Sequence, residues 1–338
     1  MESPRATPGS RRARRRGRPR HRVLLYVCLA TVAVVGATAA GTVYVKAHAR
    51  DNDVSSAAAP APSSSVSASA SGEASVEPVT EPAVDRDALL GSALGRVTVP
   101  SGAKVSAAVL DLDSGDSAAY GDSAFDTASI VKVDILAALL LQAQDAGRHL
   151  TVAEKAYATK MIENSDNASA SRLWEVIGEA AGLDAANKRF GLTSTEGGDG
   201  ALWGLTQTTA ADQLTLLQQV FGDDSKLSEA SRAYIQGLMK TVESDQRWGV
   251  SAAADGAQYA LKNGWLARST TGLWDVNSIG RVTAGGRDCL VAVLSKGTVS
   301  QAKGISLVEA AAKAAVGSFT ESSQASQASE SASASASQ

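Results

Sequence analysis

Ser129 and Lys132 are the residues of this 338-residue sequence whose types and spacing first indicate chemistry. They stand three positions apart in a stretch predicted to enter a long apolar helix, residues 125–144, so their side chains share one face. A serine hydroxyl becomes a nucleophile when a base removes its proton, and burial can lower the pKa of a lysine enough for that role. A lone Ser-x-x-Lys pair is also common by chance, as a serine near a helix cap followed by a surface lysine.

Two further polar clusters could complete such a site. Ser165-Asp166-Asn167 falls in a short break between two predicted helices, where an N-cap is the simpler interpretation. Lys262-Asn263-Gly264 lies inside a strand pattern, and glycine there marks either a bulge or the close approach of a ligand or another backbone. His149 is the only histidine of residues 84–319, so a Ser-His-Asp triad has little material and lysine is the expected base.

Strand patterns open and close the segment 84–319, and helical patterns fill its middle. Strands are expected at residues 104–112, in a short return through Tyr120, and at 258–266, 273–283 and 288–295. Helices are expected from Ser129 onward and at 151–162 (with a Thr151/Glu154 capping box), 168–178, 209–221, 228–242 and 308–316. This order predicts an α+β fold, in which a five-stranded antiparallel sheet has adjacent first and last segments and carries an inserted helical lobe.

Both ends of the chain differ from its middle in composition. Residues 1–22 hold nine arginines against Glu2, and the charge-free residues 23–45 are long enough, at about 1.5 Å per residue, to cross a bilayer core of about 30 Å. We expect a basic cytoplasmic segment, a single-pass transmembrane signal anchor and an extracellular domain at the cell membrane; small residues around Ala39 and Ala49 leave open a cleaved signal and a secreted domain. Residues 46–83, rich in Ser, Ala and Pro, and 320–338, rich in Ser, Ala and Gln, predict a disordered linker and tail.

Charge and cysteine content exclude other classes. The basic run precedes an apolar span, so it indicates membrane topology rather than nucleic-acid binding. Cys28 falls in that span and Cys289 stands alone in the exported part, which rules out an internal disulfide there and gives no cysteine cluster for zinc. We expect no cofactor, no metal and a monomer.

The order and spacing of the three clusters resemble those of the penicillin-recognising serine hydrolases, the family of class A β-lactamases and D-alanyl-D-alanine peptidases. The resemblance covers nearly all of residues 84–319 and implies the β-lactamase/transpeptidase-like sandwich. It implies that Ser129 is acylated, that Lys132 is its base or proton relay, and that Ser165 passes a proton to the leaving nitrogen. The implied substrate contacts are Asn167, Lys262, Asn263, Gly264 and Trp265.

The chain departs from the class A pattern in the connection 190–209. Class A enzymes carry a loop glutamate there in a Glu-x-x-Leu-Asn pattern, whereas here Glu196 is followed by glycines, so it is either a deacylating base or a solvated loop residue. Asn263 also replaces the usual Thr or Ser. Since general base catalysis contributes about 100- to 10,000-fold, the loss of a positioned base would let the protein acylate and then stall.

The leading hypothesis is an exported, membrane-tethered serine hydrolase that forms an acyl-enzyme through Ser129 on β-lactams or related amides. The alternatives are a D-alanyl-D-alanine peptidase acting on peptidoglycan stem peptides and a catalytically silent cell-wall-binding domain of the same fold. The expected partners are a β-lactam or cell-wall peptide, and no nucleic acid. We expect the Ser129 and Lys132 side chains within about 3 Å of each other, facing Ser165 and Lys262.

Overall fold

The computed structural model describes residues 84–336 of the chain. The predicted basic segment 1–22, apolar span 23–45 and linker 46–83 lie outside the described residues. Within the described part, none of the helices combines the length and the apolar character that crossing a membrane would require.

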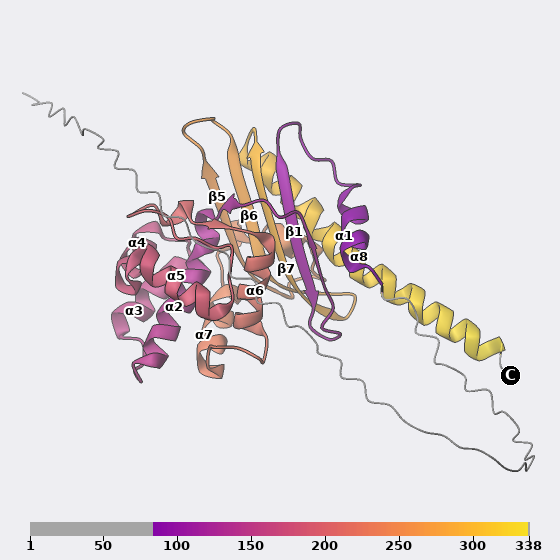
Figure 1. Ribbon diagram of the computed structural model, residues 1–338, viewed down its shortest axis with the longest axis horizontal. Coiled ribbons are helices and arrows are strands. Elements are labelled where there is room, and N and C mark those ends of the chain that lie inside the picture. Colours follow the sequence, from indigo (N-terminus) through magenta and orange to yellow (C-terminus); the bar gives the residue numbers. More distant parts are fainter. Residues whose placement is uncertain (1–83, 337–338) are drawn as a thin grey trace, which may run out of the picture. The chain divides into compact units, whose positions relative to one another are not determined.

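A five-stranded antiparallel sheet forms the middle layer of the domain, with the strand order β2-β1-β7-β6-β5 (Figure 1). The strands are β1 (Lys104–Asp111), β2 (Ser117–Tyr120), β5 (Tyr259–Ala267), β6 (Trp274–Ala284) and β7 (Arg287–Thr298). The first hairpin joins the last one through the β1–β7 pair, in which Leu110 lies opposite Leu290. The predicted five-stranded sheet with adjacent first and last segments is therefore confirmed.

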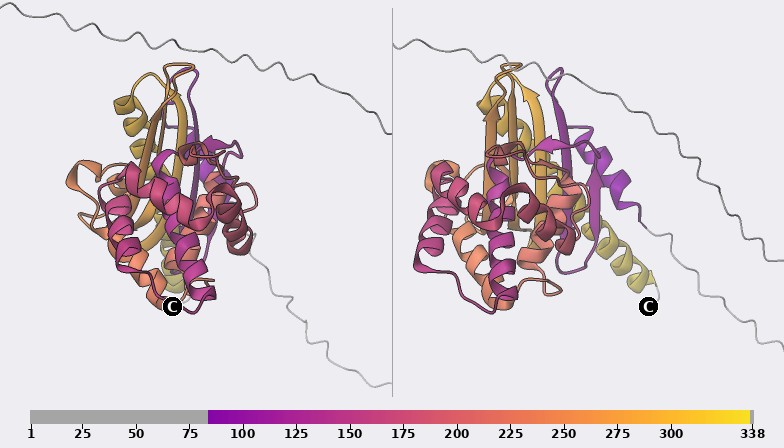
Figure 2. Two further views of the ribbon diagram at one scale, coloured as in Figure 1. Left: turned by 90° about the vertical axis from the view of Figure 1, so that its left-hand side faces the viewer. Right: turned by 60° about the vertical axis from the view of Figure 1, so that its left-hand side comes forward.

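Helices cover both faces of this sheet (Figures 1 and 2). The segment between β2 and β5 forms the helical lobe on one face, and the two terminal helices pack on the other. The lobe contains α2 (Val131–Asp145), α3 (Val152–Glu163), α4 (Asn167–Ile177), α5 (Glu179–Phe190), α6 (Ala210–Phe221) and α7 (Glu229–Lys240). Its shorter elements are β3 (Phe125–Asp126) paired with β4 (Gln207–Thr208), and the 3₁₀ turns η1 (Ala128–Ile130), η2 (Trp203–Leu205) and η3 (Ser244–Gln246). The turn η4 (Gly249–Ala253) packs against α8 in the second core. The terminal helices are α1 (Arg86–Leu94) and α8 (Gln301–Ala336).

The central strands are buried on both faces, because alternate side chains of a strand point to opposite sides. On β7, Leu290, Ala292 and Leu294 join the core under the helical lobe. Cys289, Val291 and Val293 join a second core against α1 and α8. The sheet is thus held between two apolar clusters, which makes it a rigid support for side chains at its edge strand β5.

The structure adds two helices that the sequence patterns do not predict, α1 and α5, and it lengthens the last one. Helix α5 follows α4 after the single residue Gly178, whose φ of 93° allows the chain to turn without a loop. Helix α8 begins before residue 308 and continues through most of the segment expected to be disordered. Residues 318–338 contain neither glycine nor proline, and the alanines, glutamates and glutamines among them favour helix.

Helix α2 is the innermost element of the lobe. All of its residues from Val131 to Leu141 are buried, and a helix that is apolar on every side is typical of a core position. Two of these buried residues, Lys132 and Asp134, are ionisable. Burial of an ionisable group is costly unless hydrogen bonds or other charges compensate it, so the surroundings of these two residues show what the helix is built for.

Candidate active site

Ser129 lies in the 3₁₀ turn η1, immediately before the first turn of α2. The preceding residue, Ala128, has a φ of 49°, in the left-handed region that alanine rarely occupies. Ser165 has a φ of 55°, and Glu179 is the third described non-glycine residue with positive φ. Backbone strain of this kind is found mainly at functional sites, and here two of the three instances lie at the predicted clusters.

The Lys132 ammonium group is fully buried and points into the break between α3 and α4. Its Nζ donates to the Ser165 carbonyl oxygen at 2.6 Å, to Asn167 Oδ1 at 2.8 Å and to Ser165 Oγ at 3.0 Å. Among the described residues, no hydrogen bond joins Lys132 Nζ to Ser129 Oγ. All three hydrogen bonds from the amine are accepted by oxygen atoms of Ser165 and Asn167, at the break between α3 and α4.

Ser165 is the meeting point of two lysines. Lys262, on β5, donates from Nζ to Ser165 Oγ at 3.0 Å and to the Asn263 carbonyl oxygen at 3.0 Å. The same Ser165 Oγ lies 3.0 Å from Lys132 Nζ, so one hydroxyl bridges two amines that are 130 residues apart in sequence. A hydroxyl can accept from one amine and donate to the other, which makes Ser165 a short proton path between them.

Burial brings both amines toward neutrality. It lowers the pKa of Lys132 to about 7, opposed only in part by the charge of Asp166. Burial also holds the pKa of Lys262 well below its usual value, with a further contribution from the charge of Lys132. An amine with a pKa near 7 is unprotonated in part of the population at neutral pH, so Lys132 can accept a proton.

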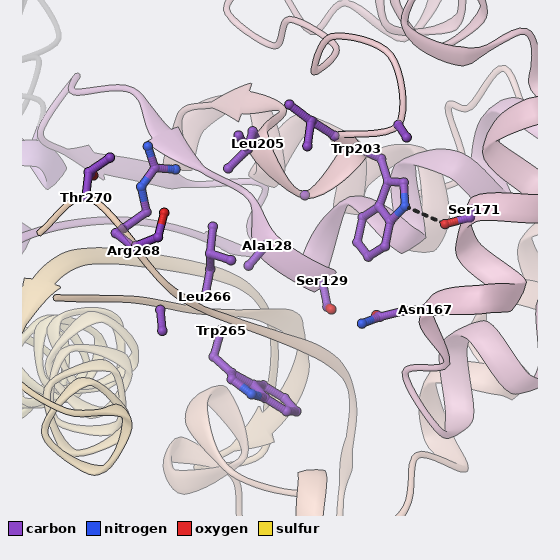
Figure 3. A pocket seen from close by; sticks show the side chains of 15 residues that line it. Ala128, Ser129, Asn167, Ser171, Trp203, Leu205, Trp265, Leu266, Arg268 and Thr270 are labelled. Carbon is purple, nitrogen blue, oxygen red and sulfur yellow. Dashed lines mark hydrogen bonds between the residues drawn. The ribbon is translucent and has the colours of Figure 1, made fainter. Parts of the chain in front are cut away.

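A cavity of about 570 Å³ opens beside Ser129 (Figure 3). Its lining comes from η1, α4, the connection 201–205 and the end of β5 with the residues that follow it. The side chains of Trp203 and Trp265 lie on either side of Ser129, and Arg268 and Thr270 lie farther along the cavity. The lining residues are Ala128, Ser129, Asn167, Ser171, Ala201, Leu202, Trp203, Gly204, Leu205, Trp265, Leu266, Ala267, Arg268, Ser269 and Thr270.

Gly264 brings strand β5 against the backbone of the serine turn. A Cβ atom on Gly264 would lie 2.6 Å from the Ser129 nitrogen and 2.8 Å from both the Ile130 nitrogen and the Thr127 oxygen. The serine turn therefore requires a glycine at this position whether or not a substrate is bound. Ser129 and Trp265, the residue after Gly264, both line the cavity.

The side chains of two predicted site residues, Asn263 and Glu196, take part neither in the cavity lining nor in the hydrogen bonds that join Lys132, Ser165 and Lys262. Asn263 is buried, and its Nδ2 donates to the carbonyl oxygens of Gln246 and Trp248 at 2.7 and 2.9 Å, so it ties the edge strand to the segment before η4. Glu196 is exposed, and its backbone pairs with that of Gln207 at 2.9 Å in both directions. Of the predicted site residues, the structure thus brings Ser129, Asn167 and Trp265 to the cavity lining. The others, which are not among its lining residues, are Lys132, Ser165, Glu196, Lys262, Asn263 and Gly264.

Trp203, Ser171 and Arg268 are among the lining residues that the sequence patterns did not single out as substrate-facing. Trp203 Nε1 donates to Ser171 Oγ at 3.1 Å, and the ring centroid of Trp203 lies 5.1 Å from Lys132 Nζ. Arg268 pairs with Asp126 at the far end of the cavity. Two features of the sequence could have indicated them. Trp203 is a large aromatic residue in a connection of mostly small and polar residues, and Arg268 follows Lys262 by six residues, just after the same predicted strand.

The sequence model of the Beta-lactamase enzyme family (Beta-lactamase2) matches residues 141–319, and the chain belongs to that family. This range includes Ser165 and Lys262 and begins after Ser129 and Lys132. Curated relatives named "Putative lipoprotein LppW", from Mycobacterium tuberculosis and Mycobacterium bovis, are 26% identical over 172 residues. That alignment covers 49% of this chain and 55% of theirs, so the chain spans about half the length of these relatives.

Solved structures agree with the family assignment at the level of the fold. PBP-A superposes with a TM-score of 0.60 at 21% identity, covering 69% of this chain and 96% of that one. A PBP-A mutant, solved as an acyl-enzyme complex with penicillin G, gives 0.59 at 21% identity, with 69% and 97% covered. A beta-lactamase from Chitinophaga pinensis gives 0.57 at 17% identity, with 68% and 98% covered. The predicted β-lactamase-like fold and family are thereby confirmed.

Proposed function

We propose that this domain is a serine acyl-enzyme former that takes β-lactams or the related D-alanyl amides of cell-wall peptides. The observation that carries the proposal is a hydrogen-bonded group in which Lys132 and Lys262 both donate to Ser165 Oγ, and Lys132 also donates to Asn167, which lines the cavity beside Ser129. Family membership and the penicillin G complex of the similarly folded PBP-A mutant support this substrate class. The arrangement provides a base, a proton path and an open space beside the nucleophile.

In the proposed step, Ser129 Oγ bonds to the carbonyl carbon of the amide, and the carbon–nitrogen bond breaks. The Ser129 proton passes to unprotonated Lys132, directly or through a neighbouring hydroxyl, and Ser165 donates a proton to the departing nitrogen. Lys132, protonated in the first step, restores the Ser165 proton across their 3.0 Å hydrogen bond, so both groups return to their starting state. In a β-lactam the broken bond lies in the ring, so the leaving nitrogen stays attached to the acyl group.

Acylation is the direct test of this proposal. The full-length protein and its Ser129→Ala variant are incubated with a fluorescent penicillin, separated by gel and weighed intact. We expect one covalent adduct of the mass of the penicillin on the wild-type chain and none on the variant. A wild-type chain that stays unlabelled by several penicillins would favour the silent cell-wall-binding domain instead. An adduct that persists in Ser129→Ala would place the nucleophile elsewhere.

We also propose that the domain is exported and held at the membrane. The lipoprotein name of the LppW relatives and the basic and apolar segments at residues 1–45 support this location. Protease added to intact cells should digest residues 84–336 if they lie outside the membrane. Protection of the domain until the cells are lysed would contradict the proposal.

A further inference from the structure

We propose that the indole of Trp203 shields the acyl group on Ser129 from water, so that the acyl-enzyme persists instead of turning over. This inference rests on the proposed acylation of Ser129. It concerns the second half of the reaction, in which an acylated serine is either released by hydrolysis or retained.

The position of the indole supports a shielding role. Its ring lies over the Lys132 amine, 5.1 Å from ring centroid to Nζ, on the side of the cavity that also holds Ser171 (Figure 3). The hydrogen bond from Trp203 Nε1 to Ser171 Oγ, 3.1 Å, fixes the ring to helix α4. Any water that approached Lys132 from this side of the cavity would have to displace the ring.

The backbone that carries the indole is also anchored. Leu205 N donates to the Leu202 carbonyl oxygen at 2.8 Å, and Thr206 N donates to that of Trp203 at 3.1 Å, which closes the turn. Farther along the connection, Gly198 N donates to Thr206 Oγ1 at 3.1 Å, and Trp174 Nε1 donates to the Gly200 carbonyl oxygen at 2.7 Å. Both ends of the indole are therefore held, one by the turn and one by Ser171.

Hydrolysis would require groups that this side of the cavity does not offer. A water oxygen must bond to the ester carbon while its proton moves to a base, and the bond between that carbon and Ser129 Oγ must break as the oxygen takes up a proton. Among the described residues that line the cavity there is no carboxylate. Glu196 is exposed and its backbone is paired with Gln207, so it does not supply one. The remaining base is Lys132, and Trp203 covers it.

The test measures release of the acyl group separately from its formation. The full chain is labelled with benzylpenicillin, freed of excess reagent and weighed intact over time. Removing the ring in Trp203→Ala should speed release by about tenfold or more, because general base catalysis by Lys132 then becomes possible. Trp203→Phe keeps an aromatic cover and should release within about threefold of wild type. Trp274→Ala, which removes a tryptophan outside the cavity lining, should match wild type. Release from Trp203→Ala at the wild-type rate would overturn the shielding role.

A second measurement does not depend on acylation. Cyanate carbamylates unprotonated amines, and peptide mass spectrometry reports how fast Lys132 is modified. If Trp203 covers the amine, Trp203→Ala should raise this rate about tenfold, and an unchanged rate would reject the shield even if penicillin never labels the protein. Should Trp203→Ala not fold, Ser171→Ala removes only the hydroxyl that fixes the indole. Faster carbamylation in that variant supports the proposal, and an unchanged rate contradicts it.

Discussion

The two sides of helix α2 carry two buried polar clusters that differ in how their atoms are paired. On the cavity side, Lys132 makes three hydrogen bonds and shares Ser165 with Lys262. On the opposite side, Asp134 accepts one bond, from Gln213 Nε2 at 3.2 Å, and its Oδ2 atom has no partner among the described residues. The cluster that opens on the cavity is well paired, and the enclosed one is not.

The two clusters therefore affect different properties of the protein: Lys132 its chemistry and Asp134 its folding stability. Burial lowers the pKa of Lys132 to about 7 and raises the pKa of Asp134 to about 7, the second value with a contribution from the charge of Asp212. Lys132 bonds to the Ser165 hydroxyl and to Asn167, which lines the cavity, so its unprotonated form could accept a proton there. Asp134 faces no described cavity, so its raised pKa expresses only the cost of burying a carboxylate. We expect substitutions on the two sides to affect different measurements.

The largest effect on activity should come from Lys132→Met. The thioether chain fills a similar volume without a buried amine, so the protein should fold, but the base is lost. We expect the rate of penicillin labelling to fall by about 100- to 10,000-fold, measured by gel fluorescence at several times. Lys155→Met, an exposed lysine of α3, serves as the control and should label at the wild-type rate. Rapid labelling of Lys132→Met would show that another group is the base.

Gly264→Ala should disturb both activity and stability, because it acts where β5 meets the serine turn. The new methyl group would lie within 2.8 Å of three backbone atoms, none of which can rotate away. We expect the free energy of unfolding, measured in urea, to fall by about 1–3 kcal/mol. Penicillin labelling should slow by up to about 100-fold, because Ser129 shifts from its position.

The control for this prediction is Gly237→Ala in helix α7. A Cβ atom there meets nothing within 4 Å, so the substitution should leave labelling unchanged. It should also stabilise the protein by about 0.5–1 kcal/mol, since alanine favours helix over glycine. Equal behaviour of the two glycine variants would remove the argument that β5 positions the serine turn.

Much of the cavity side could be predicted from the sequence. Ser129, Lys132, Ser165 and Lys262 belong to short motifs whose order along the chain is preserved, and alternation of apolar residues predicts the strand that carries Lys262. The hydrogen bonds of Lys132 to Ser165 and Asn167, rather than to Ser129, could not be predicted, because the break between α3 and α4 offers competing backbone and side-chain oxygens. Such competition depends on how helices α3 and α4 pack together, and a short sequence motif does not predict that packing.

The cover on the cavity side was harder to predict. Trp203 lies in a connection without regular periodicity, and its position depends on bonds to Ser171 and on a turn closed at Thr206. The family resemblance implied that Asn263 contacts substrate, yet its amide donates to two carbonyl groups near η4. Neighbouring residues of a strand point to opposite sides, so adjacency in sequence does not place two side chains in one site.

The smallest effect should come from Asp134→Asn on the enclosed side, and it should appear only in stability. The folded state holds a proton on Asp134 up to about pH 7, whereas an unfolded aspartate loses it near its usual pKa of 3.8. Between these values the folded chain binds more protons, so rising pH destabilises the wild type, and the penalty is complete above about pH 7. Asparagine does not titrate, and each pKa unit is worth about 1.4 kcal/mol. We therefore expect the free energy of unfolding of Asp134→Asn to exceed that of the wild type by at least about 1 kcal/mol at both pH 5 and pH 8.

Urea unfolding at the two pH values measures this gain. The exposed Asp224→Asn variant is the control and should track the wild type at both. Penicillin labelling by Asp134→Asn should keep the wild-type rate, because the residue contacts Gln213 rather than the cavity. A variant that labels slowly while its stability is unchanged would mean that the two sides of α2 are coupled. In that case the proton on Asp134 would influence Lys132 through the helix, and the division between chemistry and stability would have to be withdrawn.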